Sequence, residues 1–398
     1  MKINQLAVIF LALLAACSGS EQSAEITFND QIESIYNLGD SQYQLLATNI
    51  SSNQFPKTFE DSKVQTSGSG WWCSGFYPGT LFYLFEETGD STLLDLATEK
   101  LLELEKEQYN TTTHDLGFMM FCSFGNAYRI TSNPNYKEII YQSSKSLISR
   151  FDSTIGCIRS WDAAPWNDQW QYPVIIDNMM NLEMLLWAAE EFNDSTFAQV
   201  AKTHANTTLK NHYREDFSSY HVISYDTVTG EVEKRNTSQG YADESAWARG
   251  QAWGLYGFTI MYRFTKDETY LNQATRIADF LLNHPNFPED KVPYWDFNAP
   301  DIPNTKRDAS AGAIMASALL ELSEYVDQSL SDQYISVAET SLKTLSNKDY
   351  LANSGEIGGF LVKHSVGHMP NGTEVDVPLS YADYYYIEAL KRYQNLHQ

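Results

Sequence analysis

Two aspartates, Asp115 and Asp177, occupy equivalent positions in neighbouring repeats of the sequence, each just before an apolar helix. A pair of carboxylates on one surface can serve as general acid and general base. Alternatively, each aspartate caps its helix by accepting a backbone N–H. Asp177 follows an apolar run, where an unpaired charge is costly, so we expect one carboxyl of the pair to hold a proton near neutral pH.

The repeat that contains these aspartates is a pair of helices. In each repeat, a polar or aromatic residue opens an apolar helix, and an amphipathic helix starts about twenty residues after that opening residue. The turn between the two helices is longer in the last pair. The residues that open the five pairs are Trp72, Asp115, Asp177, Arg249 and Asp308. If the first helices stand side by side, these residues meet at one rim.

Buried first helices surrounded by amphipathic second helices predict an all-α fold, an (α/α)6 barrel or toroid. The sixth pair is split: the C-terminal DYYYIEALKRYQ forms its inner helix, and a helix around residues 32–50 closes the ring. An open α-solenoid is the alternative, and the crowding of aromatic residues at one rim favours closure. Residues 218–241 and 358–379 predict two β-hairpins that overhang this rim.

The N-terminus predicts export from the cytoplasm. Residues 1–16, with one lysine followed by an apolar run and small residues, form a predicted signal peptide. The LAACS sequence around Cys17 resembles the lipobox of bacterial lipoproteins, so we expect a lipidated Cys17, a tether over 17–28 and a single catalytic domain over 29–398. A secretory signal with a chance cysteine is the alternative. Either reading places the protein outside the cytoplasm, and the lipobox predicts anchoring to a bacterial membrane at the periplasm or cell surface.

Composition narrows the class of partner. The net charge of −24 excludes nucleic acid, and the 25 Tyr and 9 Trp residues suit binding of sugar rings. Cys73, Cys122 and Cys157 lack metal-ligand spacing, so we interpret them as buried thiols, with one oxidised pair as the alternative.

A set of ordered motifs from about residue 72 to the C-terminus resembles glycoside hydrolase family 88, the unsaturated glucuronyl hydrolases. The motifs include THDLGF, IIDNMMNL, SYHVISYD, SQGYADESAWARGQAWGLYGF, VPYWDF, KRDASAGAI and ADYYYIEAL. The resemblance implies an (α/α)6 barrel that needs no metal or other cofactor. Its implied substrates are oligosaccharides from polysaccharide lyases, which carry a 4,5-unsaturated uronic acid at the non-reducing end.

The resemblance also implies roles for individual residues. Asp177 matches the proton donor, which later acts as base, and Asp115 matches the second carboxylate. The implied substrate-binding residues are Trp72, His221, Gln239, Arg249 and Trp253. For Arg249 the alternative is a structural salt bridge, and for Trp253 it is core packing. Where some members have His-Gln-Gly, this chain has Ser238 at the first position, which bears on the preferred leaving sugar.

Further residues around the predicted site have weaker signals. Trp161 and Trp166 precede Asp177 and are candidates for the floor of the cleft. The second hairpin contains three basic side chains that either meet a sulfate or a second uronate or form a solvated loop: Lys363, His364 and His368.

The resemblance leaves two rival functions. One is an unsaturated rhamnogalacturonyl hydrolase of the family 105 type, which shares barrel and chemistry. The other is a non-catalytic surface lipoprotein that binds glycans on its aromatic rim, which would not need two carboxylates at helix starts. The expected partner in either enzyme is an anionic oligosaccharide, with or without sulfate.

Overall fold

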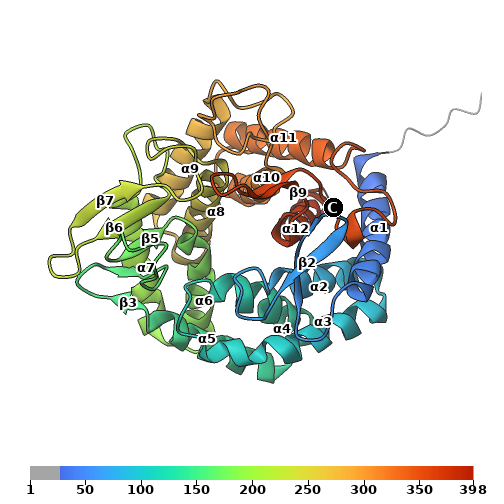
Figure 1. The fold of residues 1–398 in the computed structure, drawn as a ribbon, viewed down its shortest axis with the longest axis horizontal. Helices are drawn as coiled ribbons and strands as arrows, with labels where there is room; N and C mark the ends of the chain where they lie inside the picture. Colours follow the sequence, from blue (N-terminus) through green and yellow to red (C-terminus); the bar gives the residue numbers. More distant parts are fainter. Residues whose placement is uncertain (1–26, 398) are drawn as a thin grey trace, which may run out of the picture.

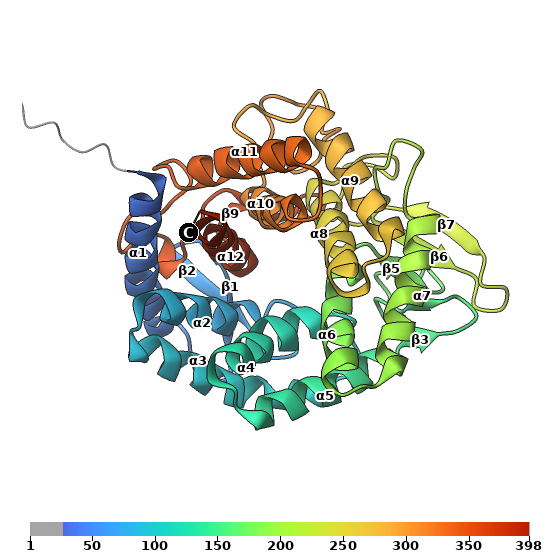
Figure 2. The same cartoon turned by 180° about the vertical axis from the view of Figure 1, so that it is seen from behind.

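The computed structural model describes residues 27–397 of the 398-residue chain. Its helices form two concentric rings (Figures 1 and 2). The inner ring consists of α2 (Phe76–Thr88), η2 (Gly117–Gly125) with α4 (Asn126–Thr131), α6 (Asn178–Glu191), α8 (Ala248–Thr265), α10 (Ala309–Ser323) and α12 (Ser380–Leu396). The outer ring consists of α3 (Ser91–Leu104), α5 (Pro134–Ile148), α7 (Ser195–Asn211), α9 (Glu268–Asn283), α11 (Gln328–Leu345) and α1 (Phe28–Thr48).

The inner ring is closed, because the last inner helix, α12, packs against both α10 and α2. The chain therefore forms the predicted α/α barrel, and the open solenoid is wrong. The prediction of a split sixth pair is also confirmed. The N-terminal α1 completes the outer layer beside α2 and α12, while α12 supplies the inner helix.

Short turns join the inner and outer helices of the five unsplit pairs, and their polar residues fix where the outer helices begin. The outer helix of each unsplit pair has an N-cap side chain that accepts a backbone N–H from the first turn: Asp90, Asn133, Asp194, Asp267 and Asp327. These caps satisfy donors that a helix start would otherwise leave unpaired.

The inner helices bury nearly all their side chains, and α10 is buried along its whole length. Near the C-terminal ends of these helices, a cluster of charged side chains replaces the apolar core. Arg263 and Arg392 both bind the carboxylate of Glu321, at 2.9 Å each, and Glu388 accepts hydrogen bonds from the hydroxyls of Tyr256 and Ser317. Pairing of these buried charges makes their burial tolerable.

Strands lie between the helix pairs, on the side where the inner helices begin (Figure 1). The two predicted hairpins are present as β6 (Val222–Tyr225) with β7 (Val232–Asn236), and β8 (Ser365–His368) with β9 (Thr373–Val377). The sequence did not indicate β5 (Pro173–Ile175), which adds a third strand to the first hairpin, or two other pairs. These pairs are β1 (Phe55–Glu60) with β2 (Lys63–Ser67), and β3 (Phe151–Asp152) with β4 (Cys157–Ile158). Two short 3-10 helices, η1 (Glu105–Tyr109) and η3 (Ile357–Gly359), complete the described elements.

The inner helix after Asp115 differs from the expected regular α-helix. It begins as the π-helix η2 and continues as α4. A π-helix has a wider turn than an α-helix and is often found at functional sites.

The cysteines that the structure describes are free thiols: Cys73 and Cys157 are buried, and Cys122 is partly exposed. Burial raises the pKa of Cys73 to about 12, so this thiol is not a ready nucleophile at neutral pH. The predicted signal peptide and Cys17 lie outside the described residues. Within residues 27–397, no helix has the length and apolar character needed to cross a bilayer.

Candidate active site

Asp177 and His221 are brought together by strand pairing. β5 and β6 are antiparallel with Ile175 opposite Val222, and the backbone N–H of Ile176 donates to the carbonyl of His221 at 3.1 Å. Asp177 is the next residue, at the start of α6. His221 Nε2 consequently lies 3.8 Å from Asp177 Oδ2.

His221 is held in one tautomer by the loop that carries Gln239. Its Nδ1 accepts the backbone N–H groups of Ser238 at 3.0 Å and Gln239 at 3.2 Å, so the ring proton lies on Nε2. Burial and the charge of Arg249 hold the pKa of His221 well below its usual range. Among the described residues, the Nε2–H has no hydrogen-bond partner. His221 is thus a neutral donor directed at the site, available to a sugar hydroxyl.

Asp115 reaches the same rim because η2 and α6 approach each other backbone to backbone. A Cβ on Gly117 would lie 2.5 Å from the Cα of Asn181, so only glycine fits there. The Asn181 side chain also accepts the N–H of Phe118 at 2.9 Å. Asp115 and Asp177 lie just before these contacting turns, so both carboxyls lie at the same end of the barrel, close enough for the charge of Asp115 to act on Asp177.

Neither aspartate caps its helix, so the capping alternative is wrong for both. The Asp177 side chain bonds to no N–H of α6, and its Oδ2 has no partner. Asp115 instead accepts the Thr113 hydroxyl at 2.9 Å and lies 3.3 Å from His114 Nε2. Their side chains are only 13% and 14% exposed, which leaves a small opening to solvent or substrate.

The ionisation of both carboxyls is shifted toward neutral pH. Burial raises the pKa of Asp115 to about 7, against a hydrogen bond from Thr113 and the positive charge of Arg150. Burial also raises the pKa of Asp177 to about 7, opposed by Arg249 and reinforced by the negative charge of Asp115. Two such groups are suited to share a proton and to serve as acid and base near pH 7.

Arg249 is placed differently from the expected substrate contact. It is 2% exposed, and its guanidinium binds Asp308 Oδ2 at 3.2 Å, the carbonyl of Gly367 at 2.7 Å and the carbonyl of Val366. The salt-bridge alternative is therefore what the structure shows. Arg249 secures β8 to α8, and its two terminal nitrogens would have to leave these partners to bind a substrate carboxylate directly.

Trp253 also lies deeper than expected. It is fully buried, and its ring packs against Phe118 at 5.0 Å and Tyr385 at 5.3 Å, so it cannot stack on a sugar. Trp253 lowers the pKa of the Asp177 carboxyl, against the effect of burial. Core packing, the alternative interpretation, is correct, with an added contribution to the ionisation of Asp177.

The other predicted aromatic residues surround the site at different depths. Trp72 is partly exposed and packs against Tyr381 at 4.8 Å. The Trp161 ring lies 6.1 Å from the His221 ring, edge to face, which places it beside the site. Trp166 contacts Trp161 at 5.1 Å but is 59% exposed, so it lies farther out than the predicted floor.

The basic residues of the second hairpin do not form a free cationic patch. Lys363 pairs with Glu356 at 3.3 Å, and His364 contacts Asp376 at 2.6 Å. His368 is half-buried, and burial lowers its pKa, so it is mostly neutral at pH 7. Ion pairs hold Lys363 and His364, and a contact of these residues with a sulfate or second uronate stays a prediction.

Two residues near the site were not singled out from the sequence. His114 is buried beside Asp115, and burial and Arg150 lower its pKa to about 3, so its ring is neutral. Arg150 binds the carbonyl of Thr111 at 2.6 Å and Asp162 at 3.0 Å, which links the Asp115 loop to the Trp161 loop. The His-Asp pair in THDLGF was a usable signal for His114, whereas nothing local marked Arg150.

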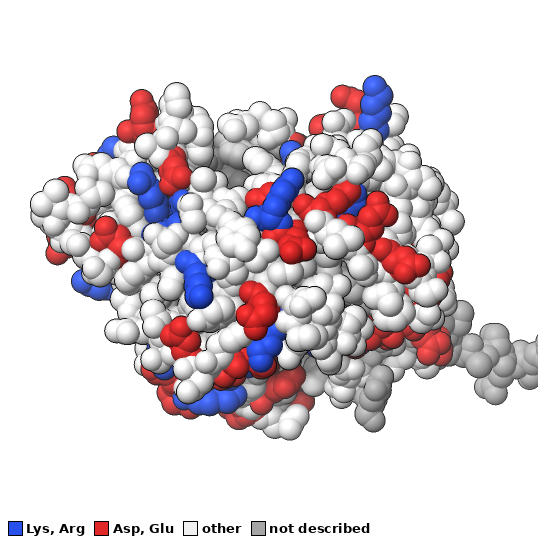
Figure 3. Space-filling model, turned by 90° about the horizontal axis from the view of Figure 1, so that it is seen from below, with Lys and Arg blue, Asp and Glu red and all other residues white. Residues whose placement is uncertain are grey.

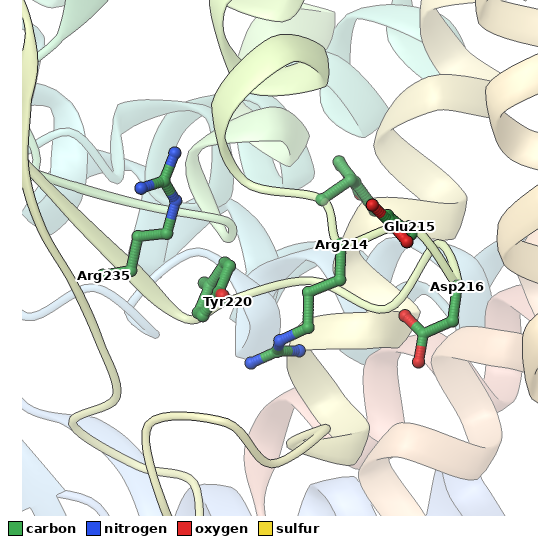
Figure 4. Close-up of a pocket in the computed structure, with 6 residues that line it drawn as sticks. Arg214, Glu215, Asp216, Tyr220 and Arg235 are labelled. Carbon is green, nitrogen blue, oxygen red and sulfur yellow. The ribbon is translucent and has the colours of Figure 1, made fainter.

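Acidic side chains, with Lys and Arg between them, are spread over the side wall of the barrel shown in Figure 3. A hollow of about 510 Å³ is lined by other residues: Tyr213, Arg214, Glu215, Asp216, Tyr220 and Arg235 (Figure 4). Arg214 donates there to the carbonyls of Ser219, Asp243 and Ser245. It therefore supports the loop near Gln239 rather than offering free donors.

Comparison with known proteins identifies the family. The model of Glycosyl Hydrolase Family 88 matches residues 49–398. This chain belongs to glycosyl hydrolase family 88. It is thus a glycoside hydrolase, and the match selects this family over the family 105 type and over a non-catalytic binding protein.

Individual relatives agree with this assignment. An unsaturated glucuronyl hydrolase of Formosa agariphila is 45% identical over 350 residues, covering 87% of this chain and 86% of the relative. The crystal structure of an unsaturated glucuronyl hydrolase specific for heparin is 47% identical, with a TM-score of 0.89, over 93% of this chain and 98% of that chain. A mutant enzyme from Streptococcus agalactiae, complexed with dGlcA-GalNAc6S, is 29% identical, with a TM-score of 0.78, over 93% of both chains.

Proposed function

We propose that this glycoside hydrolase removes a 4,5-unsaturated uronic acid from the non-reducing end of anionic oligosaccharides released by polysaccharide lyases. The observation that carries the proposal is the pair Asp115 and Asp177, whose carboxyls meet at one rim and each have a pKa of about 7. The names of the relatives support this substrate class, as does the complex with an unsaturated disaccharide.

The C4=C5 bond of such a sugar is an enol ether, because C5 carries the ring oxygen. In the proposed reaction, protonated Asp177 transfers its proton to C4, and the positive charge at C5 is shared with the ring oxygen. Asp177, now a carboxylate, takes a proton from water as the water oxygen bonds to C5. The acid and the base of the reaction are then the same side chain.

Breakdown of the hydrated sugar releases the leaving saccharide. The bond between C5 and the ring oxygen breaks, which gives a ketone at C5 and a hydroxyl on C1. C1 then carries this hydroxyl and the glycosidic oxygen, and it collapses to an aldehyde as the saccharide departs with that oxygen. One water is consumed, so the overall change is a hydrolysis that begins as a hydration.

The surrounding residues support this chemistry. We propose that Asp115 maintains the shared protonation state with Asp177, while His221 donates from Nε2 to a sugar hydroxyl and Trp72 lines the sugar. Gln239 is partly exposed beside Arg249, with its Oε1 3.4 Å from a guanidinium nitrogen, where it contacts the uronate. Arg249 contributes positive charge from below, which favours an anionic substrate without releasing its own partners.

The test is direct, because the conjugated unsaturated uronate absorbs in the far ultraviolet and hydration removes that absorbance. Purified protein should erase the signal of at least one unsaturated disaccharide in a panel from heparin, chondroitin and ulvan-type lyases. The panel also ranks leaving sugars. Unchanged absorbance for every member, with protein that is folded by circular dichroism, would refute the proposed function.

We also propose that the mature protein is lipid-anchored through Cys17 and works outside the cytoplasm. The support is the lipobox-like LAACS sequence and the apolar run before it. Expression in a bacterium with labelled palmitate should give a labelled membrane-bound protein. Cys17→Ser should lose the label, and a wild-type protein without label would contradict the anchor.

A further inference from the structure

A second aromatic side chain, Trp71, lies beside the predicted sugar contact Trp72 at the start of α2. Trp71 is 47% exposed, whereas most large apolar side chains in the described part of the chain are buried. The Lys57 ammonium lies 5.0 Å from the centroid of the Trp71 ring. An exposed aromatic ring next to a cation is suited to bind a sugar that carries a negative group.

Lys57 points toward Trp71 because of an irregularity in β1. The register with β2 shifts between Pro56 and Thr58, which makes Lys57 the extra residue of a β-bulge. Bulges redirect a side chain out of the strand pattern. Lys57 also forms an ion pair with Glu374 of β9 at 3.0 Å. The Lys57 side chain is 26% exposed and the Glu374 side chain 21% exposed.

Trp71 and Lys57 are connected to the active site through Glu374 and β8. The Glu374 carboxylate packs against Gly367, since a Cβ added to Gly367 would lie 2.5 Å from Glu374 Oε2. The carbonyl of Gly367 in turn accepts a hydrogen bond from Arg249, whose charge acts on Asp177. Trp71 and Lys57 therefore lie at the mouth of the site, one layer outside Arg249.

The ion pair leaves donors of Lys57 free. An ammonium has three N–H donors, and Glu374 is the partner that the structure shows for it. A partly exposed pair of this kind contributes little to folding. In a chain with a net charge of −24, a cation at the mouth also reduces the repulsion of an anionic substrate.

We propose that Trp71 and Lys57 form a subsite for the leaving saccharide, in which the indole stacks on its ring and the ammonium binds its sulfate or carboxylate. The subsite rests on the proposed function, since it recognises the part of the substrate that departs. It selects leaving saccharides that carry an anionic group over neutral ones, and the catalytic pair is not involved in this choice.

The experiment compares three substrates that share the unsaturated uronate and linkage but differ in the leaving sugar: neutral, sulfated, or extended by a second uronate. Lys57→Met should raise KM for a charged leaving saccharide on the order of tenfold, as expected for loss of a charge-assisted hydrogen bond, and leave the neutral one unchanged. The two charged substrates show whether sulfate or carboxylate is preferred. Trp71→Ala should raise KM for all three.

Lys63→Met is the matched control, because Lys63 is an exposed lysine on β2 of the same hairpin. It should leave every KM unchanged. Equal effects of Lys57→Met on neutral and charged substrates, or no effect on any, would overturn the subsite. A second assay measures binding of the sulfated leaving sugar alone by tryptophan fluorescence, and it needs no turnover. If the wild-type protein binds this sugar but is inactive, only the proposed function is refuted. Equal affinity of wild type and Lys57→Met for that sugar would refute the subsite.

Discussion

Burial is the main reason why Asp115 and Asp177 hold protons near neutral pH, since it raises the pKa of each carboxyl to about 7. A carboxyl that ionises near the working pH can both donate a proton and, once ionised, accept one from water. At the scale of the residue, this single property underlies the expected behaviour of the catalytic variants.

Asp177→Asn should keep the fold and lower kcat by about 10²–10⁴-fold, because the amide cannot deliver a proton to C4. Asp115→Asn should lose a comparable factor, since the two carboxyls share one protonation equilibrium. The loss of ultraviolet absorbance of an unsaturated disaccharide measures both. Near-normal turnover of Asp177→Asn would refute its role, and a fully active Asp115→Asn would refute the shared proton.

The difference in stability between Asp177→Asn and the wild type should depend on pH. The folded-state pKa of Asp177 is raised from 3.8 to about 7, so the folded protein binds more protons than the unfolded chain between these values. Wild-type stability therefore falls as pH rises from about 4 to about 7. Asn does not ionise, so at pH 8 the variant should be more stable by up to about 4 kcal/mol.

Urea unfolding of wild type and Asp177→Asn at pH 4 and pH 8 measures this difference. The two proteins should have similar free energies of unfolding at pH 4, where the buried carboxyl is protonated. A variant no more stable than wild type at pH 8 would show that the Asp177 carboxyl is not held near neutrality by burial.

The sequence identified candidate site residues better than it predicted how deeply each side chain is buried. Asp115, Asp177 and His221 were recognised by the motifs around them, and the structure brings all three to one rim. Arg249 and Trp253 carried the same kind of signal, yet both are buried beneath the site. Helical spacing shows that two residues share a face, but the depth of that face depends on the loops that cover it.

At the scale of the element, the close approach of η2 and α6 positions the two carboxylates. Gly117→Ala should destabilise the protein by roughly 2–5 kcal/mol, because the new Cβ would meet the Asn181 backbone at 2.5 Å and one helix must move. The same movement separates Asp115 from Asp177, so kcat should fall as well.

Thermal unfolding and steady-state kinetics measure the effects of Gly117→Ala. Gly68→Ala is the control, since a Cβ at Gly68 would meet nothing within 4 Å. Wild-type kcat in Gly117→Ala would show that the spacing of η2 and α6 does not set the geometry of the pair.

Arg249 also holds an element in place, because it joins β8 to α8. Arg249→Lys keeps the charge but lacks the planar fork of donors that reaches Asp308 and two carbonyls of β8, so it should lower the free energy of unfolding on the order of 3 kcal/mol. Activity should fall because β8 is less firmly held at the mouth. Urea unfolding and KM measure these effects, and an unchanged stability would contradict the structural role.

The sequence predicted the helix pairs but not the short strand β5. The helix pairs were recognisable because their apolar spacing extends over many residues and polar caps mark their ends. β5 has three residues, and its partner β6 lies almost fifty residues away in sequence, so no local pattern reveals their register. That register places Asp177 beside His221, which is why this contact could not be derived from the sequence.

At the scale of the whole molecule, closure of the ring turns repeated helix starts into one site. The contact of α12 with α2 brings the C-terminal Tyr381 beside Trp72, and the β-hairpins then surround the same end of the barrel (Figure 1). The repeat in the sequence predicted the barrel and the rim. The hairpin β1–β2, which supplies Lys57, lies outside the repeat and was not indicated.

The central claim is that the glycosidic bond breaks as a consequence of hydration at C5, and heavy-oxygen water tests it most directly. The label should enter at C5 and appear in the ketone of the opened uronate, while the departing sugar keeps its bridging oxygen. A saturated glucuronide of the same linkage, the matched control, should not be cleaved because it has no enol ether to protonate. Label at the anomeric carbon of the uronate, or efficient cleavage of the saturated control, would contradict the account.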